Sequence, residues 1–186
     1  GDISIKIAAL NVNTIGIDQS KNYIQKAKKH AERLQLPCRF YKANAYSYVC
    51  VEPVDAAFNW FTSFGYSEND IDNLKMLRNV YKSIKENGLF LLDYYNPAYI
   101  FQNFIPNQII EKHLPNGCKL IINKTSTIDF YKGMFLSTWE YFLPNNERKV
   151  TKGASRFYFA HDLKKMLLLC KFKNIMFVGD VYDNPF

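Results

Sequence analysis

The sequence predicts an α/β fold in which a three-layer, doubly wound parallel sheet has a small antiparallel β subdomain inserted. Strand-like and helix-like segments alternate through residue 93, an order typical of a parallel sheet covered by helices. Over residues 107–158 helical periodicity is lost, and β-rich stretches are separated by turn sequences, which predicts hairpins. We therefore expect a core formed by residues 1–106 and 155–186, lacking a first and a terminal strand, and an insert at 107–154.

The spacing of apolar residues and the position of Pro37 predict the first elements of the chain. Apolar residues at helical spacing predict that residues 1–10 are the remainder of a helix, which leads into a strand ending at Asp18. The next helix is predicted over residues 20–36, where Pro37 stops it, and residues 38–42 form a short strand.

The second half of the core repeats this order. A strand is predicted at 54–58, then a helix over 69–86 with Asn87-Gly88 as its C-terminal stop. The apolar run 89–92 is typical of a strand covered on both faces. After the insert, the chain is predicted to end with a helix, a strand and an aromatic tail at residues 161–171, 174–178 and 179–186.

Composition excludes several classes of protein. The 186 residues, 48% of them hydrophobic, suit one globular domain. Apolar runs fall short of the ~20 residues that cross a membrane, and the N-terminus does not resemble a signal peptide, so we expect a soluble, cytoplasmic protein. The net charge of +7 is dispersed, and zinc-finger or aromatic RNA-binding signatures are missing, which disfavours nucleic acid as a partner. Four scattered cysteines predict reduced core thiols rather than a metal site.

Asp18 is the most informative polar residue. It would lie at the carboxyl end of a buried strand, where doubly wound sheets bind ligands. An ionised carboxylate there can accept hydrogen bonds from both hydroxyls of a ribose. The alternative is that Asp18 and Ser20 cap the following helix. A sheet of this kind normally begins with a strand and a glycine-rich turn, of which this sequence contains only Gly1.

Further segments extend the pattern beyond Asp18. The segments are Ile15-Gly16-Ile17-Asp18-Gln19-Ser20, Ala43-Asn44-Ala45, residues 55–66 (DAAFNWFTSFGY), residues 88–93 (GLFLLD), Arg156-Phe157-Tyr158 and Gly179-Asp180-Val181-Tyr182. In these segments the chain resembles the class I S-adenosylmethionine-dependent methyltransferases, of the small-molecule type with an antiparallel insert. The resemblance implies a Rossmann-like fold, methyltransferase activity and S-adenosylmethionine as the cofactor.

The resemblance also implies which residues bind the cofactor. Asp18 and Gln19 would hold the ribose. Asn44 and Ala45 would meet the adenine, with Asn44 in the place of the usual acid; its amide oxygen can still accept from an amino group. The implied set is completed by the glycine-turn remnant and the inner wall: Gly1, Asn59, Trp60, Phe61 and Phe64.

An aromatic acceptor pocket is expected between the core and the insert. Its candidate residues are Tyr66, Tyr95, Trp139, Arg156 and Tyr158. Tyrosine and tryptophan suit an apolar pocket that binds a sulfonium or an amine by cation–π contact. Methyl transfer depends mainly on placing the acceptor in line, so no catalytic residue is predicted, although His113 is considered as a base. We expect a small-molecule acceptor, and a homodimer formed through the insert.

Other functions are kept as alternatives. A non-catalytic methyltransferase-like binding module is suggested by the missing glycine turn and by Asn44. An RNA methyltransferase or a nicotinamide-dependent enzyme would share much of the same sheet. Asn96-Pro97-Ala98-Tyr99 resembles the Asn-Pro-Pro-Tyr box of amino methyltransferases but follows the fifth strand of the family's sheet rather than the fourth. We therefore interpret Asn96-Pro97 as a turn that starts the next segment.

Overall fold

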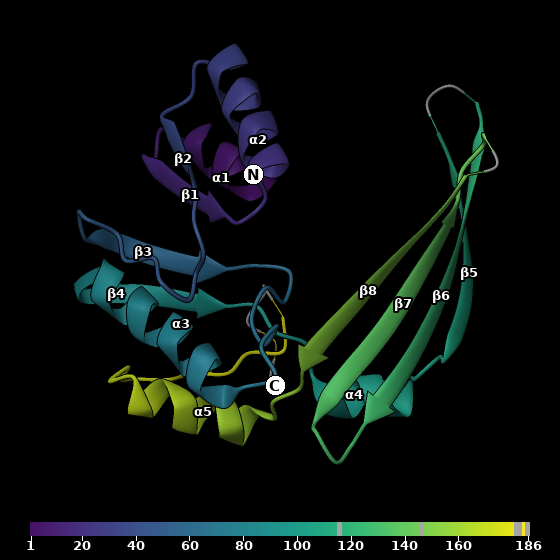
Figure 1. The fold of residues 1–186 in the computed structure, drawn as a ribbon. Helices are drawn as coiled ribbons and strands as arrows, with labels where there is room; N and C mark the ends of the chain where they lie inside the picture. The colour runs from purple at the N-terminus through teal and green to yellow at the C-terminus, as the bar shows by residue number, and fades with distance from the viewer. Residues whose placement is uncertain (115–116, 146, 181–183, 185–186) are drawn as a thin grey trace.

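The computed structural model describes residues 1–114, 117–145, 147–180 and 184. Parallel strands and helices build one part, and a long antiparallel sheet extends from it (Figure 1). Parts of two sequence expectations lie outside the described residues: the hairpin turns at 115–116 and 146, and the final segment at 181–183 and 185–186.

The first two strands form a small parallel unit with two helices. Its elements are α1 (Asp2–Ala8), β1 (Thr14–Asp18), α2 (Lys21–Arg33) and β2 (Cys38–Lys42). Thr14 of β1 pairs with Cys38 of β2, and the register continues to Asp18 and Lys42. A Cβ on Gly16 would lie 2.6 Å from the Phe40 ring, so glycine lets that ring pack directly on β1.

The second parallel unit contains the larger apolar core. Its elements are β3 (Val54–Asn59), α3 (Asp70–Ser83), β4 (Ile84–Leu92) and α5 (Ala160–Leu169). Phe64 and Leu77 are fully buried among residues of α3 and α5, and Phe90 and Leu92 of β4 pack against them. The opposite face of β4 is open, since Leu89 is 73% exposed.

The two parallel pairs are not joined by hydrogen bonds. β1 pairs with β2 and β3 with β4 in separate sheets. No Cα of β1 lies within 8 Å of a Cα of β3, whereas neighbouring strands lie about 4.8 Å apart. The α/β class and the antiparallel insert are confirmed, and the parallel strands form two pairs.

Three local expectations are corrected. The helix predicted over 69–86 ends at Ser83, because the chain turns into β4 at Ile84, which pairs with Val54. Asn87 has φ 61°, and the β3–β4 register shifts there, so Asn87-Gly88 forms an irregularity inside β4 rather than a helix stop. Residues 174–178 form no strand; only Val178 makes an isolated bridge.

A short helix leads into the insert. Asn96 accepts the Ala98 N–H at 3.0 Å and Pro97 takes the first position of α4 (Pro97–Gln102), so the dipeptide interpreted as a turn begins a helix. Four antiparallel strands follow in the order β5-β6-β7-β8. They are β5 (Asn107–His113), β6 (Lys119–Asp129), β7 (Met134–Phe142) and β8 (Arg148–Arg156).

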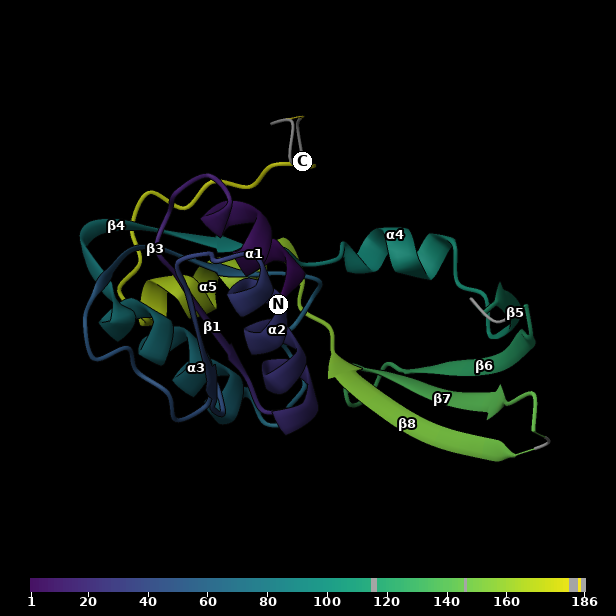
Figure 2. The same cartoon turned by 90° about the horizontal axis from the view of Figure 1, so that it is seen from above.

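Aromatic rings join the insert to α4. Phe101 of α4 contacts Phe130 and Phe135 of the insert and Phe157, which follows β8, with ring centroids 5.1 to 5.7 Å apart. Seen from above, the sheet extends sideways from the core (Figure 2). Among the described residues, the contacts that join the sheet to α4 and to the core lie at its base.

Candidate functional site

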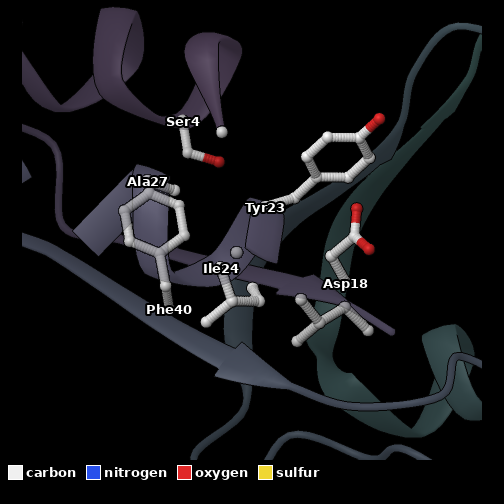
Figure 3. Close-up of a pocket in the computed structure, with 9 residues that line it drawn as sticks. Ser4, Asp18, Tyr23, Ile24, Ala27 and Phe40 are labelled. Carbon is white, nitrogen blue, oxygen red and sulfur yellow. The ribbon is translucent and has the colours of Figure 1, made fainter. Parts of the chain in front are cut away.

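A small hollow lies beside the carboxyl end of β1 (Figure 3). It measures about 70 Å³, and the residues lining it come from α1, β1, α2 and β2: Gly1, Ser4, Gly16, Ile17, Asp18, Tyr23, Ile24, Ala27 and Phe40. Gly1 approaches α2 so closely that a Cβ would lie 2.6 Å from the Ala27 Cβ. The structure thus brings Gly1 and Asp18 together at one edge.

Asp18 closes the turn that begins α2. Its Oδ1 accepts the Ser20 N–H at 2.7 Å, and the Ser20 hydroxyl accepts the Tyr23 N–H at 3.3 Å. This is the capping geometry that the sequence offered as the alternative to ligand binding. Asp18 is exposed, however, and in the described part of the chain no partner is recorded for Oδ2, so one carboxylate oxygen can still accept a hydrogen bond. Gln19 is exposed beside it.

Asn44 has a similar local role after β2. Its carboxamide oxygen accepts the Tyr46 N–H at 2.9 Å, closing a tight turn, and the side chain is exposed. The neighbouring Ala45 carbonyl accepts a hydrogen bond from Asn79 of α3 at 3.1 Å, which ties the turn to the core. The Asn44 oxygen retains one lone pair for another donor.

The loop after β3 combines a buried amide with an exposed ring. Asn59 is 8% exposed, and its Oδ1 has no hydrogen-bond partner among the described residues. A buried carbonyl oxygen without a donor is costly, so this atom is available for a ligand. Phe61 is 78% exposed, and its ring contacts Trp60 edge to face at 6.1 Å.

The same loop has an unusual backbone. Phe61 has φ 53° and Thr62 φ 51°, in the left-handed region that side chains rarely adopt. The Phe61 N–H donates to the Asp93 carboxylate at 2.8 Å, which holds the loop against the end of β4. Asp93 was not singled out as a site residue, because its partner lies 32 residues away.

Phe64 lies in the core rather than on a ligand-facing wall. Its ring has 0% exposure, and contacts Tyr158 at 5.7 Å and Tyr94 at 6.0 Å. A ligand would have to displace core packing to reach it. The described contacts of Phe64 are packing contacts, and its place in the cofactor wall stays a prediction.

Tyr158 is also buried, at 5% exposure, and forms hydrogen bonds within the protein. Its hydroxyl donates to Asp70 Oδ1 at 2.6 Å and accepts from Asn73 Nδ2 at 2.8 Å. Burial, with a smaller contribution from the Asp70 carboxylate, raises the pKa of Tyr158 and keeps the phenol protonated. The hydroxyl thus has both a donor and an acceptor partner within the protein, and a place for Tyr158 in the acceptor pocket stays a prediction.

Arg156 is likewise occupied by protein groups. Its guanidinium pairs with Asp70, Nε to Oδ1 at 2.6 Å, and donates to the Lys132 carbonyl at 3.0 Å. The place of Arg156 in an acceptor pocket stays a prediction, and its described polar contacts are all with protein groups. Sequence reasoning missed Asp70, because an acid in the first turn of a helix is ordinarily explained by the helix dipole.

The remaining acceptor candidates are separated. Tyr66 is 59% exposed, and Tyr95 is half-buried where the insert meets the core. Trp139 lies in the outer part of β7 with the Lys124 ammonium over its ring, 4.9 Å from the centroid. Five residues separate it from Met134 at the base of the strand, which corresponds to about 17 Å. Tyr66 and Tyr95 are the candidates that lie near the core.

The remaining candidates for chemistry are histidine and cysteine side chains. His113 is the exposed last residue of β5, at the far end of the insert. Cys50 and Cys170 are buried, and Cys38 and Cys118 are partly exposed. Within the described ranges, no group of three acidic, histidine or cysteine residues is arranged to hold a metal ion. The described helices are all too short or too polar to cross a membrane.

Comparison with known proteins identifies the family. A family model described as a methyltransferase domain matches residues 1–144. No curated protein matches the sequence. Among solved structures, the CcbJ methyltransferase from Streptomyces caelestis superposes with a TM-score of 0.83 at 14% identity, over 99% of this chain and 73% of that one.

Two further structures extend the comparison. An S-adenosylmethionine-dependent methyltransferase from Clostridium acetobutylicum gives a TM-score of 0.72 at 17% identity, over 86% of this chain and 63% of that one. CalS10, an amino pentose methyltransferase from Micromonospora echinaspora, gives 0.62 at 10% identity, over 98% and 86%. At these identities the superpositions establish the fold. The family model covers most of the chain, and the chain therefore belongs to the methyltransferase domain family, which confirms its resemblance to the class I S-adenosylmethionine-dependent methyltransferases.

Proposed function

We propose that this protein transfers a methyl group from S-adenosylmethionine to a small-molecule acceptor. The observation that supports this most strongly is the convergence of Gly1 and the unengaged Asp18 oxygen at the end of β1, in a chain that belongs to a methyltransferase family. An exposed carboxylate at a strand end is the group that would accept hydrogen bonds from a ribose.

The residues at three strand ends fit different parts of the cofactor. Asp18 and Gln19 would hold the ribose, and the turn at Asn44 and Ala45 would meet the adenine. The Asn59 oxygen that lacks a donor would accept one from the ligand, beside Trp60 and Phe61. The hollow at Asp18 is smaller than the usual 300–1,000 Å³ of a ligand pocket, so it would hold only part of the molecule.

The reaction needs placement more than acid–base chemistry. S-adenosylmethionine supplies a methyl group on a positively charged sulfur, which is already an activated leaving group. The protein has to hold an acceptor atom in line with it, and this is the role we assign to the junction where Tyr66 and Tyr95 lie. Tyrosine rings attract cations, which favours an amine as the acceptor group. One structural neighbour acts on an amino pentose.

Calorimetric titration of the full-length protein with S-adenosylmethionine and S-adenosylhomocysteine tests the proposal. We expect binding of both at micromolar to millimolar concentrations. Absence of binding of either ligand at millimolar concentration would overturn the proposal. Binding without formation of S-adenosylhomocysteine, when the protein is mixed with a panel of amines and amino sugars, would favour the alternative of a non-catalytic binding module.

The location, the acceptor class and the oligomeric state are also part of the proposal. We expect a cytoplasmic location, and a small-molecule acceptor is preferred over nucleic acid because the positive charges are dispersed. A homodimer through the insert stays a prediction. Sedimentation velocity at micromolar concentration distinguishes it from a monomer.

A further inference from the structure

Arg156 lies where the insert returns to the core. Both its backbone N–H and its backbone carbonyl form hydrogen bonds to other segments. It is the last residue of β8. Its N–H donates to the Gly65 carbonyl at 2.7 Å. Its carbonyl accepts two hydroxyls, from Tyr94 at 2.6 Å and Tyr95 at 3.1 Å. One residue of the insert is thus bonded to the segment after β3 and to the segment after β4.

The side chain adds three more attachments. The guanidinium forms a two-pronged pair with Asp70 at the start of α3, Nε to Oδ1 at 2.6 Å and Nη2 to Oδ2 at 3.2 Å. Nη1 donates to the Glu68 carbonyl at 3.1 Å and to the Lys132 carbonyl at 3.0 Å. Only a planar guanidinium can make this set of bonds in fixed directions; a lysine ammonium cannot.

These hydrogen bonds connect Arg156 to the loop that is proposed to face the cofactor. Gly65 has φ 91°, and a Cβ there would lie 2.9 Å from the Arg156 carbonyl oxygen, so the contact requires glycine. From Tyr94 the chain leads back one residue to Asp93, which accepts the Phe61 N–H at 2.8 Å. Arg156 therefore reaches the loop at both ends, directly through Gly65 and indirectly through Asp93.

We propose that Arg156 is a positioning residue for methyl transfer, which fixes the insert against the loop formed by residues 60–65. The inference rests on the proposed function. The acceptor is expected at the junction and the cofactor along the loop. The hydrogen bonds of Arg156 therefore set the distance between acceptor and cofactor. Small errors in that separation slow an in-line transfer steeply. The Arg156 side chain, held by Asp70, Glu68 and Lys132, fixes the backbone that bonds to Gly65 and Tyr94, and it acts in this way without touching either ligand.

A purely stabilising Arg156 is the competing explanation, and local hydrogen exchange separates the two. In the full-length protein we compare Arg156→Lys with Arg148→Lys. The control lies in the same strand and also pairs with a carboxylate, that of Glu140, but in the outer part of the insert. Exchange of the Phe61 amide reports the loop, and exchange of the Leu77 amide, in the buried core of α3, reports global unfolding.

We expect Arg156→Lys to speed exchange at Phe61 by about tenfold, with no change at Leu77 and no change at either amide in Arg148→Lys. Equal acceleration at Phe61 and Leu77 would show a merely stabilising role and overturn the proposal, as would an unchanged Phe61 amide. If Arg156→Lys does not fold, Tyr94→Phe replaces it; this variant removes one bond to the Arg156 carbonyl, and the same local effect is expected.

A second measurement separates this inference from the proposed function. S-adenosylhomocysteine is titrated into the unmodified protein and into Arg156→Lys. If neither protein binds S-adenosylhomocysteine, the proposed function is wrong, and so is the role of Arg156 in methyl transfer. If both bind with affinities within about threefold, while exchange at Phe61 differs, the residue positions the loop without contacting the ligand. A Kd raised by more than about a hundredfold in Arg156→Lys, with Phe61 exchange unchanged, would make Arg156 a direct ligand instead.

Discussion

The two halves of the candidate site are built in opposite ways. At the ends of β1 and β2, Asp18 and Asn44 are exposed, and each bonds a backbone N–H two residues further along the chain. At the junction with the insert, Arg156 and Tyr158 bond to groups more than 80 residues away in sequence. The first half leaves polar atoms accessible to a ligand. The second half uses its polar atoms to hold the protein together.

This difference teaches how to interpret a polar side chain near a site. A side chain that needs only its own turn for support retains acceptor capacity toward solvent, as the second oxygen of Asp18 does. A side chain whose donors and acceptors are all met by distant segments acts through position. Substitutions should therefore affect ligand binding in the first half, and stability or geometry in the second.

The largest effect is expected on stability, when a fully buried ring is removed. Phe64→Ala should lower the free energy of unfolding by about 3–5 kcal/mol, because the ring has 0% exposure and its removal leaves a cavity. Denaturant unfolding measures the loss. The matched control is Phe61→Ala, whose ring is 78% exposed and whose removal should cost less than about 0.5 kcal/mol. A normally stable Phe64→Ala that binds S-adenosylmethionine poorly would restore Phe64 to the cofactor wall.

Asp18→Ala should weaken S-adenosylhomocysteine binding by about 1–3 kcal/mol, the usual loss for a charge-assisted hydrogen-bonded pair. Calorimetry measures the change. Asp18→Asn is the control, because it keeps an oxygen for the Ser20 N–H and loses only the charge; an intermediate affinity is expected. Should all three proteins bind equally, Asp18 serves only to close the turn before α2.

Asn44→Asp tests the exposed half of the site by a substitution that should strengthen cofactor binding rather than weaken it. The new carboxylate keeps the acceptor for the Tyr46 N–H, so stability should change by no more than about 0.5 kcal/mol. It also introduces the acid that this family usually has at this position, and under the proposed placement of the adenine at this turn, binding should tighten by up to about tenfold. Weaker binding would mean that the adenine does not reach this turn.

The smallest effect near neutral pH concerns the tyrosines of the junction. Burial raises the pKa of Tyr94, Tyr95 and Tyr158, so their phenols remain donors in the folded protein. In the unfolded chain they ionise near pH 10, and their contribution to stability is therefore complete below about pH 10 and is lost as the pH rises toward the raised values. Unfolding measured between about pH 8 and 11 should show this decline, less steeply in Tyr158→Phe. A flat profile would contradict it.

Sequence alone predicted the features that depend on neighbouring residues. The strand ending at Asp18, the helix stopped before Pro37 and the strand at 54–58 follow from local periodicity and turn chemistry, and they agree closely with β1, α2 and β3. Gly1, which the family resemblance assigned to the cofactor site, lines the same hollow as Asp18.

The features that sequence could not give depend on distant pairing. The end of α3 at Ser83 is set by the pairing of Ile84 with Val54, which overrides a helical pattern that continues to residue 86. The engagement of Arg156 by Asp70 joins residues 86 positions apart, and an arginine at the end of a strand has no local sign of its partner. Burial of Phe64 likewise depends on α5.

Because the described contacts of the insert with the core lie near its base, a small rotation there displaces its outer end by a much larger distance. β6 has 11 residues and is therefore about 36 Å long, whereas the bonds that hold the sheet to the core are gathered around Arg156 at its base. A rotation of about 5° at the base would displace the outer ends of the strands by about 3 Å, the length of a hydrogen bond. The bonds around Arg156 therefore determine how precisely the outer part of the sheet is placed relative to the core.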